Sequence, residues 1–221
     1  SIYCELDKSD SLVEIVPEAY IQSAVYDSNY INGNTEQLLR EFTSFSLKYE
    51  IELHRYSKER TKMLNNLSQK KVYEKEVSIG EIFDINYGEN SIKSDLMKGD
   101  IISISSQGVD NGCCGFYDLP ITHNEIIITV PRTGSIGCAF VQEYKCNVDD
   151  NCMVLTLKKD IQLSIIEFYY VASVIREEKW RYKYGRQVTP YRLGKQIIDF
   201  KQLDYNRLSA FRNRMNNKIN L

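Results

Sequence analysis

A glycine-containing loop, residues 131–137, lies between two segments rich in β-branched residues. Its glycines permit a tight turn and a close approach of the backbone to a ligand. Arg132 supplies a positive charge, the hydroxyl of Ser135 can donate to a phosphate oxygen, and Thr133 lies between them. The loop therefore predicts a nucleic-acid contact through Arg132, Thr133 and Ser135, and an ordinary strand-to-strand turn is the alternative.

A basic segment, residues 179–195, carries six Lys or Arg residues and no Asp or Glu. Aromatic residues alternate with the cations, which suits phosphate contacts combined with stacking or apolar contacts to bases. The candidate DNA contacts in it are Lys179, Arg181, Lys183, Tyr184, Arg186, Gln187, Thr189, Tyr191 and Arg192. The alternative interpretation is a solvated helix end whose cations balance nearby acids.

A third candidate is the stretch 105–112, which contains Gln107 and ends in an Asp-Asn-Gly turn signal. Glutamine and asparagine side chains can pair with the edge of adenine through two hydrogen bonds. Gln107 and Asn111 are therefore further candidate DNA contacts, although isolated residues of these types are usually simple loop residues.

Motifs for catalysis or metal binding are missing from the sequence. It has no phosphate-binding P-loop, nucleophile elbow, zinc-protease motif, dinucleotide-binding loop or Asn-Pro-Pro-Tyr motif. The six cysteines and two histidines do not follow zinc-site spacings. The sequence predicts no catalytic residue and no metal ligand in this chain, and a cysteine paired with His123 is a weakly supported alternative.

The composition indicates a packed domain of 221 residues, or one domain with an appended helical piece. A net charge of −2 argues against non-specific nucleic-acid binding, so a DNA-binding role depends on the clustering of the cations. Unpaired cysteines and the lack of a long apolar run or a signal peptide predict a cytoplasmic setting with no membrane contact.

Hydrophobic periodicity divides the chain into four parts. Residues 1–33 form a linker or the tail of an upstream domain, and 34–72 form one long helix with its N-terminus at Asn34, after an Asn-Gly-Asn turn. Residues 73–200 carry short strands, notably 78–85, 100–105, 125–130, 137–141 and 153–157, then a helix over 161–180 and a short helix opened by Thr189-Pro190. Residues 201–221 contain a polar terminal helix. The predicted fold class is α+β with a mixed, mostly antiparallel sheet.

The apolar stripe of the long helix requires a partner. The stripe comprises Leu38, Phe42, Phe45, Tyr49, Leu53, Tyr56, Leu64 and Leu67, with Arg60 in its one gap. Packing within the chain and contact with a second chain, as a spacer or coiled-coil arm, are equal alternatives.

Together these elements resemble the target recognition domain of the type I restriction enzyme specificity subunit family. The resemblance covers about residues 77–200 and rests on Gly80-Glu81-Ile82-Phe83, Gly99-Asp100-Ile101, Asn111-Gly112, Arg132 to Gly137, Phe140-Val141-Gln142, Phe168-Tyr169-Tyr170 and Gly185 to Ile197. Two features depart from the family pattern. The long helix precedes the domain, and only one recognition domain is present. The segment from Leu12 to Tyr20 also resembles the tail of methylase polypeptides that carry their own recognition domain. The chain therefore resembles either a half-size specificity subunit or the C-terminal part of a fused N6-adenine methylase.

This resemblance implies a domain that reads double-stranded DNA in the major groove for a methyltransferase subunit, or for an upstream methylase domain of the same polypeptide. That module would hold S-adenosylmethionine, flip the adenine and methylate it, and this chain would hold no cofactor. Pairing with a second copy through the long helix is a further expectation. A coiled-coil interaction protein without DNA binding is the alternative from another class.

Overall fold

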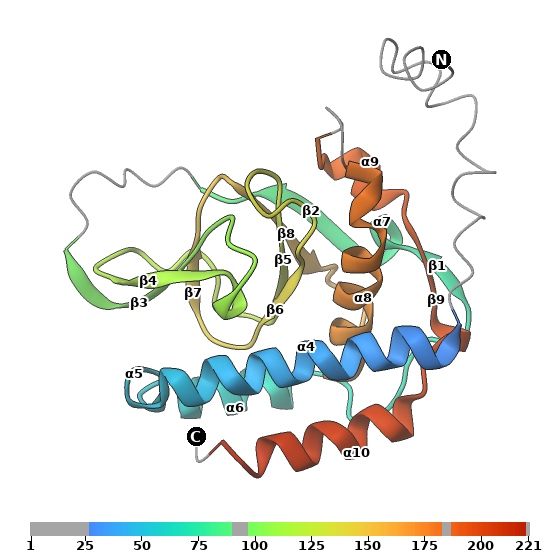
Figure 1. Ribbon diagram of the computed structural model, residues 1–221, viewed down its shortest axis with the longest axis horizontal. Helices are drawn as coiled ribbons and strands as arrows, with labels where there is room; N and C mark the ends of the chain where they lie inside the picture. Colours follow the sequence, from blue (N-terminus) through green and yellow to red (C-terminus); the bar gives the residue numbers. More distant parts are fainter. Residues whose placement is uncertain (1–26, 90–96, 183–186, 220–221) are drawn as a thin grey trace.

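The computed structural model describes residues 27–89, 97–182 and 187–219. Helices α4 (Ser28–Lys48) and α10 (Tyr205–Asn216) lie side by side along one edge of the molecule, although they are far apart in sequence (Figure 1). Helix α8 (Ile165–Glu177) packs against both helices and against the sheet. The first and last described helices therefore enclose the same side of the fold.

Helix α4 begins earlier than the sequence predicts. The side chain of Asp27 caps it by accepting from the backbone N–H groups of Asn29 and Tyr30. Asn32 lies within the helix and its side-chain amide donates to the carbonyl of Gln202 at 2.8 Å. The predicted turn at residues 32–34 and the predicted N-terminus at Asn34 are therefore wrong. Asp27 caps the helix instead, and the hydrogen bond to Gln202 stabilises Asn32 within it.

The predicted long helix is divided into three. Tyr49 separates α4 from α5 (Glu50–His54), and Arg55 and Tyr56 separate α5 from α6 (Ser57–Asn65). Because the helix changes direction at these two breaks, apolar residues of the stripe on each piece can pack against the rest of the domain. The stripe residues that become fully buried are Leu38, Phe42, Phe45, Leu53 and Tyr56. Of the two alternatives for this stripe, packing within the chain is the one observed.

Within the described residues the strands form three small sheets, which confirms the mixed, mostly antiparallel α+β fold class. The two-stranded sheet pairs β1 (Glu76–Ser78) with β9 (Ile197–Asp199). The four-stranded sheet has the order β2 (Phe83–Tyr87), β8 (Cys152–Leu157), β5 (Ile127–Pro131), β6 (Phe140–Gln142), all antiparallel. The three-stranded sheet has the order β4 (Cys113–Tyr117), β3 (Lys98–Ile104), β7 (Cys146–Val148), with β3 and β7 parallel.

The predicted strand over 78–85 is interrupted. A short helix, α7 (Ile79–Ile82), separates β1 from β2. Ser78 caps it, and the Glu81 carboxylate accepts from the backbone N–H of Ser78 at 2.8 Å, which completes a capping box. The predicted continuous strand is therefore wrong, because the Ser78-x-x-Glu81 capping box starts a helical turn within the alternating pattern.

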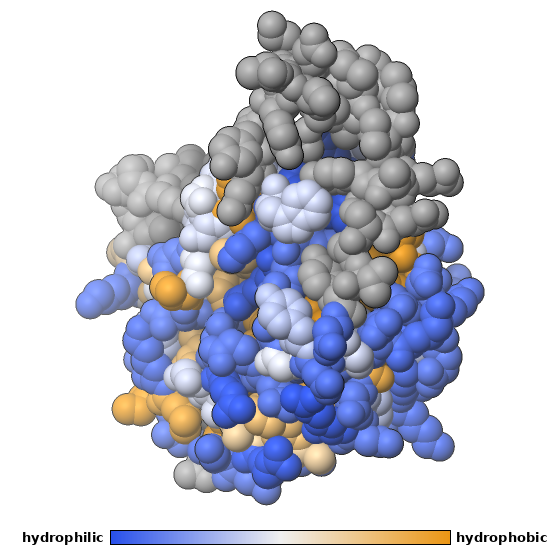
Figure 2. All heavy atoms as spheres, turned by 45° about the vertical axis from the view of Figure 1, so that its right-hand side comes forward, coloured by the Kyte–Doolittle hydropathy of each residue, from blue (hydrophilic) through white to orange (hydrophobic). Residues whose placement is uncertain are grey.

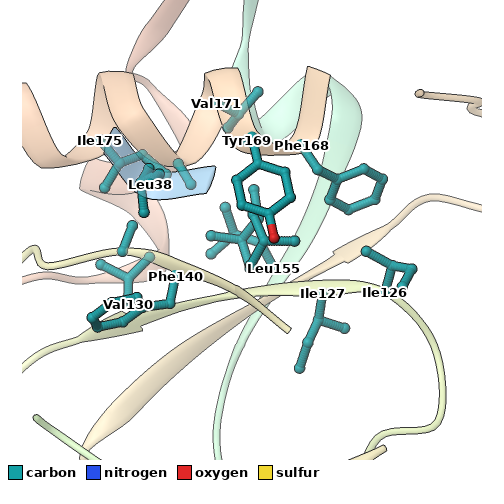
Figure 3. Packing of buried hydrophobic residues seen from close by; sticks show 14 of the residues in the cluster. Leu38, Ile126, Ile127, Val130, Phe140, Leu155, Phe168, Tyr169, Val171 and Ile175 are labelled. Atoms are coloured by element: carbon teal, nitrogen blue, oxygen red, sulfur yellow. The ribbon is translucent and has the colours of Figure 1, made fainter. Parts of the chain in front are cut away.

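The core lies between α8 and the four-stranded sheet. Figure 3 shows Phe168, Tyr169 and Ile175 of α8 facing residues of the sheet and of the segment that leads into β5. Those residues are Ile126, Ile127, Val130, Phe140 and Leu155, all buried. Each such side chain contributes about 1.5–3 kcal/mol on leaving water, so this layer contributes strongly to the stability of the fold.

A buried carboxylate joins the helical layer to the sheet. Glu143 follows β6 and has no exposed surface. Arg60 of α6 donates to its Oε2 at 2.7 and 3.0 Å, and Arg212 of α10 donates to its two oxygens at 2.6 and 2.9 Å. The Tyr169 hydroxyl donates to Oε1 at 2.7 Å. Burial alone would raise the pKa of Glu143, but the two arginines outweigh it and lower that pKa to about 2.

Replacing Gly33 with alanine is expected to stabilise the protein by up to about 1 kcal/mol, because alanine is the better helix former. Gly33 lies inside α4, and no other atom lies within 4 Å of the position that a Cβ would take. Urea unfolding measures the change. A clear loss of stability would contradict the helical assignment and favour the turn at residues 32–34.

Candidate nucleic-acid interface

The loop after β5 is the tight, glycine-dependent turn that the sequence predicts. Gly134 and Gly137 have φ values of 58° and 74°, in the region that favours glycine. The N–H of Gly137 donates to the carbonyl of Pro131 at 2.9 Å, which closes the turn. Thr133 is exposed, whereas Ser135 is half-buried, with its Oγ close to Gly108.

Arg132 lies on an aromatic platform beside this loop. Its guanidinium carbon is 4.7 Å from the centroid of the Tyr87 ring, at the end of β2. Its Nη1 is 3.4 Å from the carbonyl oxygen of Asp150, and the Thr133 hydroxyl donates to Asn151 at 3.1 Å. The ring fixes one face of the guanidinium, which leaves a positioned, half-buried cation at the surface.

The segment that carries Gln107 packs directly against the same loop. The N–H of Ser135 donates to the carbonyl of Ser106 at 3.2 Å. Gln107 is half-buried, and Val109 is 66% exposed. The structure therefore brings Gln107, Thr133 and Ser135 together, and no local signal in the sequence predicts the contact between the two loops.

Asn111 is placed in the interior rather than on this surface. It is 3% exposed, and its amide nitrogen donates to the carbonyl of Val141 and to the side chain of Gln142, both at 3.0 Å. Gln142 returns a bond from its own amide nitrogen to the carbonyl of Asn111, also at 3.0 Å. Asn111 thus anchors the predicted Asp-Asn-Gly turn, the 3-10 segment η1 (Asp110–Gly112), whose residues all have positive φ.

The basic segment begins beside the glycine loop. Lys179 lies in η2 (Glu178–Tyr182), and its Cβ is only 2.7 Å from the position that a Cβ on Gly137 would take. Lys179 is exposed, and the neighbouring Trp180 is 41% exposed. Lys179 therefore lies next to the end of the glycine loop that carries Thr133 and Ser135.

Arg181 forms an ion pair with Glu178, which immediately precedes the basic segment 179–195. Its Nε is 2.6 Å from Oε2 of Glu178, and both side chains are nearly buried. For this residue the structure favours the alternative interpretation, a cation that neutralises a nearby carboxylate. Burial raises the pKa of Glu178, and Arg181 opposes that shift.

The end of the basic segment forms the short helix α9 (Pro190–Gly194), as predicted from Thr189 and Pro190. The Thr189 hydroxyl accepts from the N–H of Arg192 at 3.2 Å, so its hydroxyl serves as the helix cap. Arg192 also donates to the carbonyl of Gln187 at 3.2 Å. Gln187 and Tyr191 are exposed, and Lys195 donates to the Tyr191 hydroxyl.

Three of the candidate contacts, Lys183, Tyr184 and Arg186, lie outside the described residues. Three exposed aromatic or apolar side chains lie beside the candidate DNA contacts but were not predicted among them. They are Tyr87, Val109 and Trp180. The alternation of aromatic residues with cations could have identified Trp180. Nothing local marks Tyr87 or Val109, because their importance depends on contacts between segments distant in sequence.

The alternative of a cysteine nucleophile paired with His123 can be compared with the position of His123 in the structure. His123 pairs with Cys146 as an isolated backbone bridge. Burial raises the pKa of the Cys146 thiol, which disfavours a thiolate nucleophile at this place. Within residues 27–89, 97–182 and 187–219, no three His, Cys, Asp or Glu side chains are grouped as metal ligands. No helix in the part of the chain that the structure describes is long and apolar enough to cross a membrane.

The face of the molecule in Figure 2 is mostly hydrophilic, and its hydrophobic side chains occur in small separate groups. The model of the type I restriction modification DNA specificity domain matches residues 71–203. The chain belongs to this family, which confirms the predicted specificity-domain assignment.

Two solved structures have a weak likeness to this chain. The S subunit of a type I restriction-modification system from M. genitalium has 14% identity and a TM-score of 0.47, over 86% of this chain and 56% of that one. The HsdS subunit from Thermoanaerobacter tengcongensis has 13% identity and a TM-score of 0.43, over 86% and 51%. This chain spans about half the length of those subunits. None of the curated proteins matches it.

Proposed function

We propose that this chain reads DNA sequence for a type I restriction–modification methylase. In this proposal the loops at 106–109 and 132–135 contact base edges in the major groove, and Arg132 and Lys179 hold phosphates that fix the register. The observation that carries the proposal is the contact between the loops at 106–108 and 133–135, with Lys179 packed against Gly137 at the end of the second loop, in a chain that belongs to the specificity-domain family.

Each part of the surface suits a different contact. Gln107 can pair with adenine through two hydrogen bonds, and the hydroxyls of Thr133 and Ser135 can bond to bases or phosphates. The Arg132 guanidinium, held flat on Tyr87, is pre-organised for a phosphate oxygen or a guanine edge. Trp180 offers an exposed ring beside Lys179.

The proposed partner is a methylase module that binds S-adenosylmethionine, flips the adenine and methylates it. It is a separate methyltransferase subunit or a domain of the same polypeptide, and the assembly works in the cytoplasm. The apolar stripe of α4–α6 lies in the chain's own core, so it no longer supports pairing with a second copy, or a coiled-coil protein without DNA binding.

Replacing Arg132 and Lys179 together with alanine is expected to weaken DNA binding about a hundredfold at 0.1 M salt. Each lost phosphate contact removes about 0.9 from the slope of log K against log salt, and so about one power of ten at this concentration. The measurement is the DNA affinity of the chain assembled with its methylase module, at four or more salt concentrations.

Lys201→Ala is the matched control, because Lys201 is exposed and paired with Glu76 on the connection between β9 and α10. It should leave both affinity and slope unchanged. Wild-type affinity and slope in the double variant would contradict the proposed interface.

A further inference from the structure

Two glycines and two serines interlock the loops at 106–108 and 133–135. A Cβ on Gly108 would lie 2.8 Å from the Oγ of Ser135 and 3.0 Å from its Cβ. A Cβ on Gly134 would lie 2.9 Å from the carbonyl oxygen of Ser106. Each loop therefore has a glycine where the serine of the other loop needs space, and the bond from the Ser135 N–H to the Ser106 carbonyl lies between them.

Both loops are also fixed at their far ends. The 105–109 segment runs into the buried η1 turn, which Asn111 and Gln142 hold through three hydrogen bonds. The 132–135 loop is closed by the bond from Gly137 to Pro131. Because each loop is anchored independently, the contact between Gly108 and Ser135 determines the spacing of their exposed tips.

Gln107 and Val109 flank Gly108, and Val109 is 66% exposed. A shift at Gly108 therefore moves an amide that can read adenine and an apolar side chain that can contact the thymine methyl group. Direct readout tolerates little displacement, since a mismatched base pair costs about 1–3 kcal/mol.

We propose that the two loops act as a single reading element, in which the contact between Gly108 and Ser135 positions Gln107 and Val109 and so sets the sequence preference. This inference rests on the proposed function. It means that neither loop specifies bases independently of the other, and that recognition changes when either side of the contact changes.

The test is a double-mutant cycle with Gly108→Ala, Ser135→Gly and both together. Gly108 has no positive φ, so alanine there disturbs only the space that Ser135 occupies, and glycine at 135 restores that space. The chain with its methylase module first selects its preferred sequence from random DNA. Affinities for that sequence and for random DNA, and the thermal unfolding midpoint, are then measured for each variant.

Gly108→Ala is expected to lower affinity for the preferred sequence roughly tenfold and to leave affinity for random DNA unchanged. The double variant should bind as tightly as Ser135→Gly alone, which gives a coupling of about tenfold. Gly33→Ala is the control for a glycine-to-alanine change away from the loops. Losses that multiply in the double variant would overturn the inference, as would an unchanged preference in Gly108→Ala.

The two proposals fail in different ways. A wild-type assembly without any sequence preference would overturn the proposed function, and with it this inference. A wild-type preference that the cycle leaves uncoupled would overturn the inference alone. A fall in both affinities together with the unfolding midpoint would show a purely structural contact, which also overturns it.

Discussion

Replacing Glu143 with alanine is expected to destabilise the protein by about 3–5 kcal/mol, the range for removing one partner of a buried ion pair. The change leaves Arg60 and Arg212 buried without their shared carboxylate, and the Tyr169 hydroxyl loses its acceptor. The four residues come from α6, the segment after β6, α8 and α10, so the loss loosens the helical layer from the sheet. Urea unfolding followed by circular dichroism measures the effect.

Glu74→Ala is the matched control, because its carboxylate pairs with Lys71 but is largely exposed. It should change stability by less than about 1 kcal/mol. Acid titration gives a second readout. The pKa of Glu143 lies near 2 in the folded state, below its ordinary value of 4.5, so its stabilising contribution is present above pH 4.5 and is lost as the pH falls towards 2. An equally small effect of both variants would contradict the role of this cluster.

Gln142→Leu is expected to cost about 2–4 kcal/mol and to loosen the turn that ends the Gln107 segment. The Gln142 amide nitrogen donates to the Asn111 carbonyl at 3.0 Å and to the Thr129 hydroxyl at 2.9 Å, and its oxygen accepts from Asn111. Leucine fills the space but offers no partner to these buried groups, each of which costs about 1–3 kcal/mol when unsatisfied. Urea unfolding and hydrogen exchange of the amides at 105–112 measure the two effects.

Gln37→Leu is the same substitution on the exposed face of α4, where it should change stability by no more than about 0.5 kcal/mol. If exchange at 105–112 stays as slow in Gln142→Leu as in the wild type, then the Asn111–Gln142 pair does not anchor the turn.

Local signals in the sequence predicted local structure well. The Ile-rich run correctly predicted the buried strand β5, and the glycines predicted the turn after it. Thr189-Pro190 predicted the start of α9. In each case a few adjacent residues decide the backbone conformation, so neighbouring letters carry the information.

Local signals could not predict the contacts between segments that are distant in the sequence. Glu143 follows an apolar strand like any surface acid, and its partners Arg60 and Arg212 lie 83 and 69 residues away. The interlock of the loops at 106–108 and 133–135 is likewise a tertiary contact. The Glu178–Arg181 pair could have been predicted from the sequence, because an acid three residues before an arginine on a helical turn is a local signal.

Placement of α4 at one end of the fold has a consequence for synthesis. Its apolar face packs against α8, which begins at Ile165, more than a hundred residues after α4 ends at Lys48. At 5–20 residues per second, roughly 5 to 25 s pass before a ribosome has made that partner. During this interval the side of Phe42 that Tyr169 of α8 covers in the folded protein stays uncovered. The nascent chain therefore exposes apolar surface until α8 has been made, and such surface favours aggregation.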